Sequence, residues 1–216
     1  MKYRSLLFDW SGTLVDDLPP TLHATNAVLG RHQVGPLTRE EFRDRFRLPY
    51  PEFYEEVLPG VPVESLQDHF RLSFQQSPDQ VTVLPHAREM LVWCRAQGIR
   101  CFVLSSMDVG LFTRQAHDFE LHGHFEAIYA GVVDKRERIG EILSTHNLAV
   151  SETAFVGDMV HDVHTAKHGG ISAVAVATGY DPVERLAQSD PHHFFDHLGD
   201  FRDWLENSAQ PGLAAS

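Results

Sequence analysis

The sequence predicts an α/β fold in which a parallel sheet carries acidic residues at its carboxyl edge and a group of helices interrupts the chain after the first strand. Two short apolar runs, at residues 6–8 and 154–157, lead directly into Asp9 and Asp158. Such runs are typical of parallel strands that are buried on both faces. Residues 19–77 show helix signals without strand signals, whereas helix and strand patterns alternate from residue 85 onward.

The first strand, residues 6–8, is followed by four expected helices. The prolines at positions 19 and 20 suit a first helical turn, and Thr38 with Glu41 forms the pattern of a capping box. Prolines also open the patterns of the last two helices. The four helices are expected at residues 21–31, 38–46, 51–57 and 63–76.

The second half of the chain alternates between amphipathic helices and apolar strands. Gly98 is a stop signal for the first of these helices, and Ser105 follows the next strand directly. Helices are expected at residues 85–97, 108–120, 136–146, 182–188 and 199–207, with one more beginning near residue 159. Strands are expected at residues 99–104, 125–130, 154–157, 171–177 and 193–195.

The length and charge of the chain limit the function classes. A chain of 216 residues suits one α/β domain with an inserted subdomain. Acidic residues outnumber Lys and Arg by 30 to 18, and the net charge of −12 disfavours binding to nucleic acid or to anionic membranes. Cys94 and Cys101 form neither a C-x-x-C pair nor part of a ligand cluster. The first residues do not have the pattern of a signal peptide, and no apolar run approaches the ~20 residues of a membrane span. We therefore expect a cytoplasmic protein that is a monomer or a weak dimer.

Asp9 is the first candidate for chemistry. An aspartate at the end of a strand either ends the strand and caps a turn or presents a reactive carboxylate at the edge of the sheet. In the second interpretation Asp9 is a nucleophile that attacks phosphorus, while backbone N–H groups and a hydroxyl of Gly12 and Thr13 bind the phosphoryl oxygens.

Two further acids follow about 150 residues later. Asp158 ends an apolar strand, and Asp162 comes one helical turn later if the chain is helical from Met159 onward, so that both can face Asp9. Three carboxylates at one edge repel one another unless a cation joins them. Because hard oxygen ligands suit Mg²⁺, the sequence predicts a magnesium site at this edge.

Four segments of the chain carry a resemblance to a known family. They read FDWSGTLVD at residues 8–16, VLSS at 103–106, an isolated Lys135, and VGDMVHD at 156–162. In order and spacing they resemble the four motifs of the haloacid dehalogenase-like (HAD) hydrolase superfamily, in its phosphoglycolate phosphatase-like branch. The resemblance implies a Rossmann-like three-layer core at residues 1–16 and 80–207 and an α-helical cap at 17–79. Residues 208–216 read as a loose tail.

The resemblance also implies roles for single residues. Asp9 would form an aspartyl-phosphate, and Ser105 and Lys135 would hold the transferring phosphoryl oxygens, with Ser106 beside them as a further phosphate-binding residue. The expected Mg²⁺ ligands are Asp9, the backbone carbonyl of Ser11, Asp158 and Asp162.

Three arginines lie where caps of this kind carry residues that select the substrate. Arg43, Arg45 and Arg47 could clamp a substrate carboxylate or a second phosphate. Each of them also fits a solvated helix face. The substrate expected on this basis is a small phosphorylated metabolite.

Ser11 departs from the family pattern, which has a second aspartate two residues after the nucleophile as general acid and base. That function is worth typically ~10²–10⁴-fold in rate, and a serine hydroxyl titrates far too high to perform it well. Its backbone carbonyl can still bind Mg²⁺. Asp16, Asp17 and His161 are the candidates that could supply the missing acid.

Four functions remain open from the sequence. The first is a Mg²⁺-dependent phosphatase that is slow or restricted to good leaving groups. The second is a phosphonatase-like enzyme, because members of that branch resemble this chain in the segment D-W-x-G-T. Those enzymes use a lysine of the cap, however, and residues 19–77 contain no lysine. A dehalogenase usually needs no metal, so Asp158 and Asp162 argue against it. A degenerate member that only binds a phosphorylated ligand has no need of the nucleophile Asp9.

Overall fold

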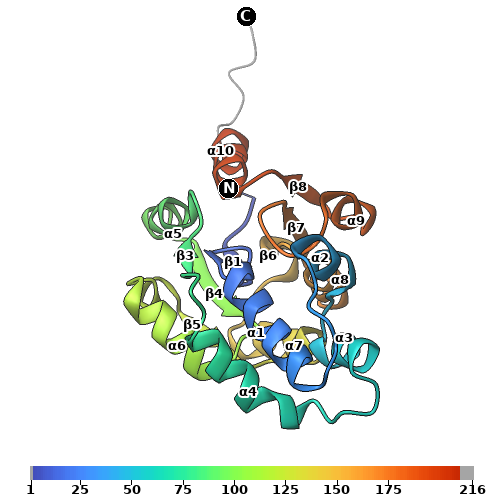
Figure 1. The fold of residues 1–216 in the computed structure, drawn as a ribbon. Helices are drawn as coiled ribbons and strands as arrows, with labels where there is room; N and C mark the ends of the chain where they lie inside the picture. Colours follow the sequence, from blue (N-terminus) through green and yellow to red (C-terminus); the bar gives the residue numbers. More distant parts are fainter. Residues whose placement is uncertain (1, 210–216) are drawn as a thin grey trace, which may run out of the picture.

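The computed structural model describes residues 2–209, and its centre is a six-stranded sheet in which every strand runs parallel to its neighbours. The strand order is β5-β4-β1-β6-β7-β8 (Figure 1). The predicted α/β fold is therefore confirmed. The strands are β1 (Ser5–Phe8), β4 (Arg100–Leu104), β5 (Ala127–Tyr129), β6 (Thr153–Gly157), β7 (Ser172–Val176) and β8 (His193–Phe195).

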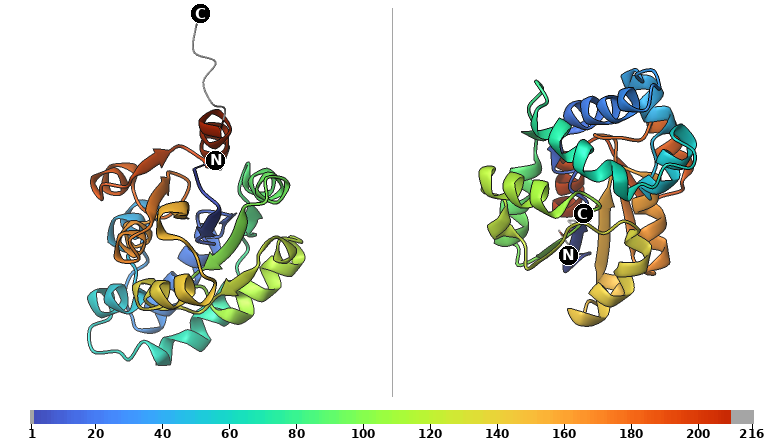
Figure 2. Two further views of the ribbon diagram at one scale, coloured as in Figure 1. Left: turned by 180° about the vertical axis from the view of Figure 1, so that it is seen from behind. Right: turned by 60° about the horizontal axis from the view of Figure 1, so that its bottom comes forward.

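Helices cover both faces of this sheet, which explains why its central strands are apolar at nearly every position. Successive side chains of a strand point to opposite faces. Leu6 and Phe8 of β1 pack toward α5 (Ala87–Ala96), α6 (Val109–Asp118) and α10 (Leu198–Ala209). Leu7 packs toward α7 (Lys135–Thr145), α8 (Val160–His168) and α9 (Val183–Gln188). The result is three layers (Figure 2).

Four helices are inserted between two very short strands. These helices are α1 (Leu18–Arg31), α2 (Arg39–Arg45), α3 (Tyr50–Val57) and α4 (Glu64–Gln75). The strands β2 (Val15–Asp16) and β3 (Thr82–Val83) pair antiparallel. The two segments by which the chain leaves and re-enters the sheet domain therefore lie side by side. Sequence patterns missed both strands because two residues give no periodicity. We call the segment from Leu18 to Gln75 the cap.

The cap has its own apolar centre and rests on the carboxyl edge of the sheet. Phe42 and Phe53 are fully buried between its helices, and Met159 and Tyr180 pack into the same cluster. Both of the latter lie in loops that follow the ends of β6 and β7. The cap therefore lies over the edge at which the predicted acids emerge (Figure 2).

The expected helix ends agree closely with the observed ones. Glu41 N–H donates to Thr38 Oγ1 at 3.2 Å and Thr38 N–H donates to Glu41 Oε2 at 2.8 Å, which confirms the capping box. A loose tail was expected at 208–216, but α10 runs to Ala209, and residues 210–216 lie outside the described part. Between residues 2 and 209 no helix has the length and apolar character that crossing a membrane requires.

Candidate active site

The position of Asp9 is fixed by the strand before it and by the indole after it. Asp9 N–H donates to the Val156 carbonyl at 2.9 Å, so the ladder between β1 and β6 extends one residue beyond Phe8. The Trp10 ring is fully buried and donates from Nε1 to Gln115 Oε1 at 2.7 Å. Because both neighbours are anchored in the core, the Asp9 carboxylate is held at the carboxyl edge with little freedom.

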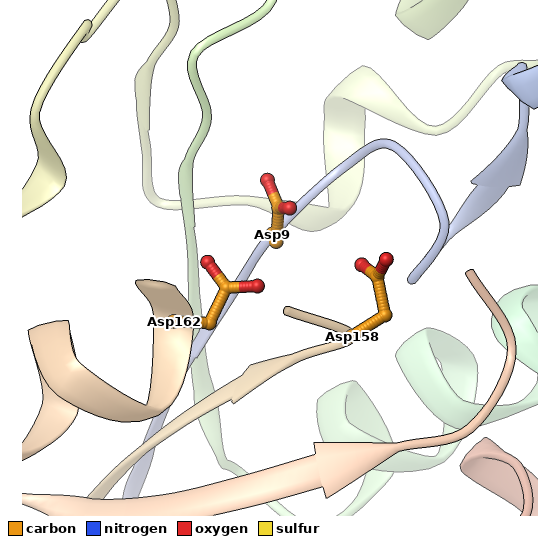
Figure 3. Close-up of side chains that lie close together, drawn as sticks. All are labelled: Asp9, Asp158 and Asp162. Atoms are coloured by element: carbon orange, nitrogen blue, oxygen red, sulfur yellow. The ribbon is translucent and has the colours of Figure 1, made fainter. Parts of the chain in front are cut away.

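The structure brings Asp9, Asp158 and Asp162 together, as the spacing predicted (Figure 3). One oxygen of each carboxylate lies within 4.8 Å of the others, and all three side chains are buried. Asp158 follows β6 directly. Asp162 lies in the first turn of α8, where its Oδ2 accepts a hydrogen bond from Met159 N–H at 3.1 Å.

Lys135 supplies a positive charge to this cluster. Its Nζ lies 2.9 Å from Asp9 Oδ1 and 2.7 Å from Asp162 Oδ1, and the side chain is fully buried. Burial alone would favour the neutral amine, but Asp162 and Asp9 outweigh it and hold the pKa of Lys135 above its usual value. Lys135 is therefore a fixed cation between two carboxylates.

One lysine does not balance three carboxylates. Burial raises the pKa of Asp9 to about 6, although Lys135 acts in the opposite direction. Burial, and then the charges of Asp9 and Asp162, raise the pKa of Asp158 well above its ordinary value. A divalent cation among the three would remove this repulsion and restore the ionised forms.

The donor set fits such a cation. Asp9 Oδ1 is buried and accepts no well-directed hydrogen bond, even though the Lys135 ammonium is close. The Asp158 carboxylate accepts hydrogen bonds from Thr13 Oγ1 at 2.8 Å and from Tyr180 N–H at 2.7 Å, and these two bonds fix its orientation. Buried carboxylate oxygens with fixed orientation are the ligands that hard divalent metals prefer. The buried aspartates can therefore bind a metal ion.

Glycines make room for the carboxylates. A Cβ at Gly12, Gly157 or Gly179 would collide with the side chain of Asp158 or Asp162. Gly12 also has a φ of +76°, which side chains rarely adopt. Gly179 was not recognised from the sequence, because it lies in a loop 21 residues after Asp158 (179 − 158) and only the fold brings them together.

Ser11 is backed by a buried carboxyl group. Ser11 Oγ donates to Asp17 Oδ2 at 2.7 Å, and the Tyr180 hydroxyl donates to Asp17 Oδ1 at 2.8 Å. Burial raises the pKa of Asp17 to about 7, against the effect of these two hydrogen bonds. Asp17, Ser11 and Asp9 line the same cavity.

The other two candidates for the missing acid have different surroundings. Asp16 is half-buried and its Oδ1 accepts a hydrogen bond from Leu18 N–H at 3.3 Å, at the start of α1. His161 Nε2 accepts a hydrogen bond from Lys135 N–H at 3.2 Å, and burial lowers the pKa of His161 to about 4. Neither side chain lines the cavity, so Asp17 is the candidate that the geometry favours.

The donors that we expected to bind phosphoryl oxygens are partly engaged elsewhere. Gly12 N–H donates to the Val15 carbonyl at 2.7 Å and Thr13 N–H to the Trp10 carbonyl at 3.3 Å. The Thr13 hydroxyl donates to Asp158 and Gly12 leaves room for that carboxylate, so both residues shape the turn and hold the acid, while their role in binding phosphoryl oxygens stays a prediction.

Ser105 and Ser106 lie beyond the end of β4. Ser105 is buried, and its Oγ accepts a hydrogen bond from Met107 N–H at 3.2 Å, which leaves its hydroxyl proton free to donate. Ser106 lines the cavity together with Asp9. Both positions are next to β1 in the sheet, because β4 is its direct neighbour.

The three cap arginines, for which we expected a clamp on the substrate, bind groups of the protein itself. Arg43 donates from Nε to the Tyr180 carbonyl at 3.1 Å and from Nη2 to the Asp181 carbonyl at 2.8 Å. Arg45 and Arg47 both pair with Glu56, at 2.8 and 2.5 Å. None of the three lines the cavity. The sequence could not reveal these partners, because they depend on how α2 packs.

Comparisons with known proteins agree with this geometry. A model of the family described as haloacid dehalogenase-like hydrolase matches residues 6–176. A 5′-nucleotidase of Pseudomonas aeruginosa is 25% identical, with 96% of this chain and 97% of the relative covered. A phosphoglycolate phosphatase of Pseudomonas fluorescens is 24% identical, with 90% of this chain and 77% of the relative covered.

The fold is shared with solved structures as well. The crystal structure of a predicted phosphoglycolate phosphatase from Haemophilus somnus superimposes with a TM-score of 0.80 at 18% identity. The match covers 95% of this chain and 99% of the other. At this identity the likeness shows the fold alone.

Proposed function

The chain belongs to the haloacid dehalogenase-like hydrolase family, and we propose that it is a Mg²⁺-dependent phosphatase that acts on a small phosphomonoester through an aspartyl-phosphate. The observation that carries this proposal is the place of Asp9, which lines the cavity, contacts Lys135 and belongs to the cluster of three carboxylates. Relatives named as a 5′-nucleotidase and a phosphoglycolate phosphatase support hydrolysis of phosphate esters.

Asp9 would supply the attacking oxygen. An Asp9 oxygen forms a bond to phosphorus while the bond from phosphorus to the leaving oxygen breaks, which gives the aspartyl-phosphate. Attack requires the ionised carboxylate, and Lys135 at 2.9 Å favours that form against the effect of burial. Lys135 remains in place during the attack, so its charge offsets the negative charge at the reacting centre.

The metal-binding residues follow from the same cluster. Asp9, Asp158 and the Ser11 carbonyl would hold Mg²⁺, and Asp162 would orient the surrounding ligands. When bound, the ion supplies positive charge to the phosphoryl oxygens. Asp162 also accepts a hydrogen bond from Lys135 Nζ at 2.7 Å, so it positions that ammonium next to Asp9.

The leaving alkoxide needs a proton, and the pair of Ser11 and Asp17 offers the route. The two side chains share a hydrogen bond of 2.7 Å and line the cavity beside Asp9. When Asp17 is protonated, this hydrogen bond would run from Asp17 Oδ2 to Ser11 Oγ, and Asp17 would pass its proton to Ser11 Oγ as the Ser11 hydroxyl proton moves to the leaving oxygen. In the second half of the reaction the same pair would take a proton from the water that hydrolyses the aspartyl-phosphate.

Phosphate release from a panel of acyl phosphates and of aryl, sugar and carboxylate-bearing phosphate esters, with and without Mg²⁺, tests the proposal on wild type, Asp9→Asn, Asp158→Asn and Asp203→Asn. Asp203 is an exposed aspartate of α10 that does not line the cavity, and it provides the matched control. We expect Mg²⁺-dependent release from the wild type and the control, a loss of at least about a thousandfold in Asp9→Asn, and loss of activation by Mg²⁺ in Asp158→Asn.

Release that persists in Asp9→Asn, or that is indifferent to Mg²⁺ and to a chelator, would contradict the proposal. If the wild type binds Mg²⁺ but hydrolyses none of the esters, the chain is a ligand-binding member of the family.

A further inference from the structure

The cavity beside Asp9 has one polar end, and the rest of its wall is mainly apolar and aromatic, with a few uncharged polar side chains such as Thr25 and Gln67. Its volume is about 380 Å³, which suits a single small organic molecule. Asp9, Ser11 and Asp17 form the polar end. Cap and core contribute aromatic side chains to the remainder, namely Phe46, Tyr50, Tyr54, Phe70, Phe74 and Tyr180.

Charged groups that could bind an anionic leaving group are scarce on this wall. Apart from the acids at the polar end, only Arg71 and Asp108 carry charge among the lining residues. Arg71 pairs with Asp68 at 2.8 Å, and about half of its side chain is exposed. Asp108 Oδ1 accepts a hydrogen bond from Leu111 N–H at 3.0 Å and caps α6.

The cap arginines add no positive charge to the cavity wall. Arg43 binds carbonyl oxygens of the core, and Arg45 and Arg47 both pair with Glu56. A carboxylate placed against the aromatic side chains would lose its hydration, and the one cation of the wall, Arg71, is already engaged in an ion pair, so burial of the carboxylate there is unfavourable. An uncharged ring would gain by apolar burial and by contact with the aromatic side chains.

We propose that the phosphate ester hydrolysed here carries an uncharged aromatic group, which the wall formed by cap helices α3 and α4 and the α6 end of the core receives while Asp9 meets the phosphoryl group. The inference rests on the proposed phosphatase function and specifies its substrate class. It excludes small carboxylate-bearing esters such as phosphoglycolate as preferred substrates. The ring can belong to an arylalkyl alcohol or to a nucleoside.

Two matched pairs of esters separate recognition of the ring from the chemistry of the leaving group. Benzyl phosphate and glycerol 3-phosphate are both esters of primary alcohols, as are adenosine 5′-monophosphate and ribose 5-phosphate. Burial of one ring predicts that kcat/KM is about tenfold to a hundredfold higher for the aromatic member of at least one pair. The pair that responds identifies a carbocyclic or a heteroaromatic ring, and phosphoglycolate should be as poor as glycerol 3-phosphate.

Phe70 and Leu72 provide a matched test on one helix. Both belong to α4, but Phe70 lines the cavity whereas Leu72 is 53% exposed and does not. Phe70→Ala should lower kcat/KM for the preferred aromatic ester about three- to tenfold, mainly through KM, and lower it for the non-aromatic counterpart by a clearly smaller factor. Leu72→Ala should affect neither ester.

Binding of phosphonates keeps the test independent of turnover. Benzylphosphonate and phosphonoacetate are not cleaved by attack at phosphorus, and calorimetry on the wild type with Mg²⁺ should show at least about tenfold tighter binding of the aromatic compound. Equal rates within both ester pairs, or equal binding of the two phosphonates, would overturn the inference even if Asp9-dependent release persists. Conversely, absence of release from every ester would refute the phosphatase while the phosphonate ratio still decides the inference.

Discussion

At the level of single residues, a hydrogen bond joins Ser11 to the buried carboxyl group of Asp17. The resemblance to the family implies an acid at the position of Ser11, and Asp17 comes six residues later (17 − 11). The chain turns back at residues 10–15, where Gly12 N–H donates to the Val15 carbonyl at 2.7 Å, and this turn brings the Asp17 carboxyl to 2.7 Å from the Ser11 hydroxyl. The Asp17 carboxyl group thus lies one hydrogen bond behind the Ser11 hydroxyl, which lines the cavity.

Replacement of Asp17 by Asn tests this proton route. We expect hydrolysis of alkyl esters such as benzyl phosphate to slow by about a hundredfold, since general acid catalysis is lost. Phenyl phosphate should slow much less, because a phenol, with a pKa near 10, leaves more readily without a proton. Initial rates at saturating ester give the two ratios. An equal loss for both esters would show that Asp17 acts only as a structural residue.

The same variant makes a prediction about stability and pH. The pKa of Asp17 is about 7 in the folded protein, above its ordinary value of 3.8. Between these values the folded state binds more protons than the unfolded state, so this group makes the free energy of unfolding fall as pH rises. Asp17→Asn should remove that decline.

Urea unfolding in the presence of a chelator at pH 4.5 and 7.5 measures this effect. The stability of the wild type relative to Asp17→Asn should decrease between the two pH values by a few kcal/mol. A constant difference would mean that the Asp17 pKa is not raised.

At the level of elements, the loop after β7 connects the start of α8, which carries one residue of the aspartate cluster, to the cap. Asp181 Oδ2 accepts a hydrogen bond from Val160 N–H at 2.6 Å, at the start of α8. Its Oδ1 binds Arg185, which also donates to the carbonyls of Asp44 and Phe46 at the end of α2, at 2.7 and 3.3 Å. The position of the cap helix therefore depends on a residue of α9.

Removal of this arginine should loosen α2. In Arg185→Ala, amide hydrogen exchange at the end of α2 should become about tenfold faster or more, because its terminal carbonyls lose their partner. Arg138→Ala is the control, since Arg138 pairs with Glu141 on the same helix, α7. Mass spectrometry of the exchanged peptides gives the rates. Unchanged exchange in α2 would show that apolar packing alone holds the cap.

Two glycines should respond in opposite ways to replacement by alanine. Gly140 lies within α7 with open space around it, so Gly140→Ala should stabilise the protein by ~0.5–1 kcal/mol. At Gly179 a Cβ would collide with Asp158, so Gly179→Ala should displace that carboxylate. The increase in melting temperature caused by Mg²⁺ should persist in the first variant and shrink in the second. Equal increases would indicate that Asp158 is not a metal ligand.

At the level of the whole molecule, the strand order accounts for the site. β1 lies between β4 and β6, so the residues that follow these three strands meet at one edge. This edge carries Asp9, Ser105 and Asp158, and the cap packs over it through Met159 and Tyr180. The cavity is the space that remains between these two parts.

The same principles explain how much was predictable from the sequence. Apolar periodicity and helix signals depend on near neighbours, so the helices and the strands of the large sheet were found to within a few residues. Asp9 and Asp158 could be grouped because ends of parallel strands meet at a common edge, whereas Lys135 was placed with them only by the resemblance to the family. The contact between Ser11 and Asp17 and the partners of the cap arginines depend on tertiary packing, for which the sequence has no local signal.

The most direct test of the account is to trap the covalent intermediate. The protein should be quenched in acid during turnover of phenyl phosphate with Mg²⁺, digested, and examined by mass spectrometry. We predict that the peptide containing Asp9 gains the mass of one phosphoryl group and that fragmentation places this group on Asp9. Active turnover without phosphorylation of Asp9, or with the group on another residue, would contradict the assignment of Asp9 as the nucleophile.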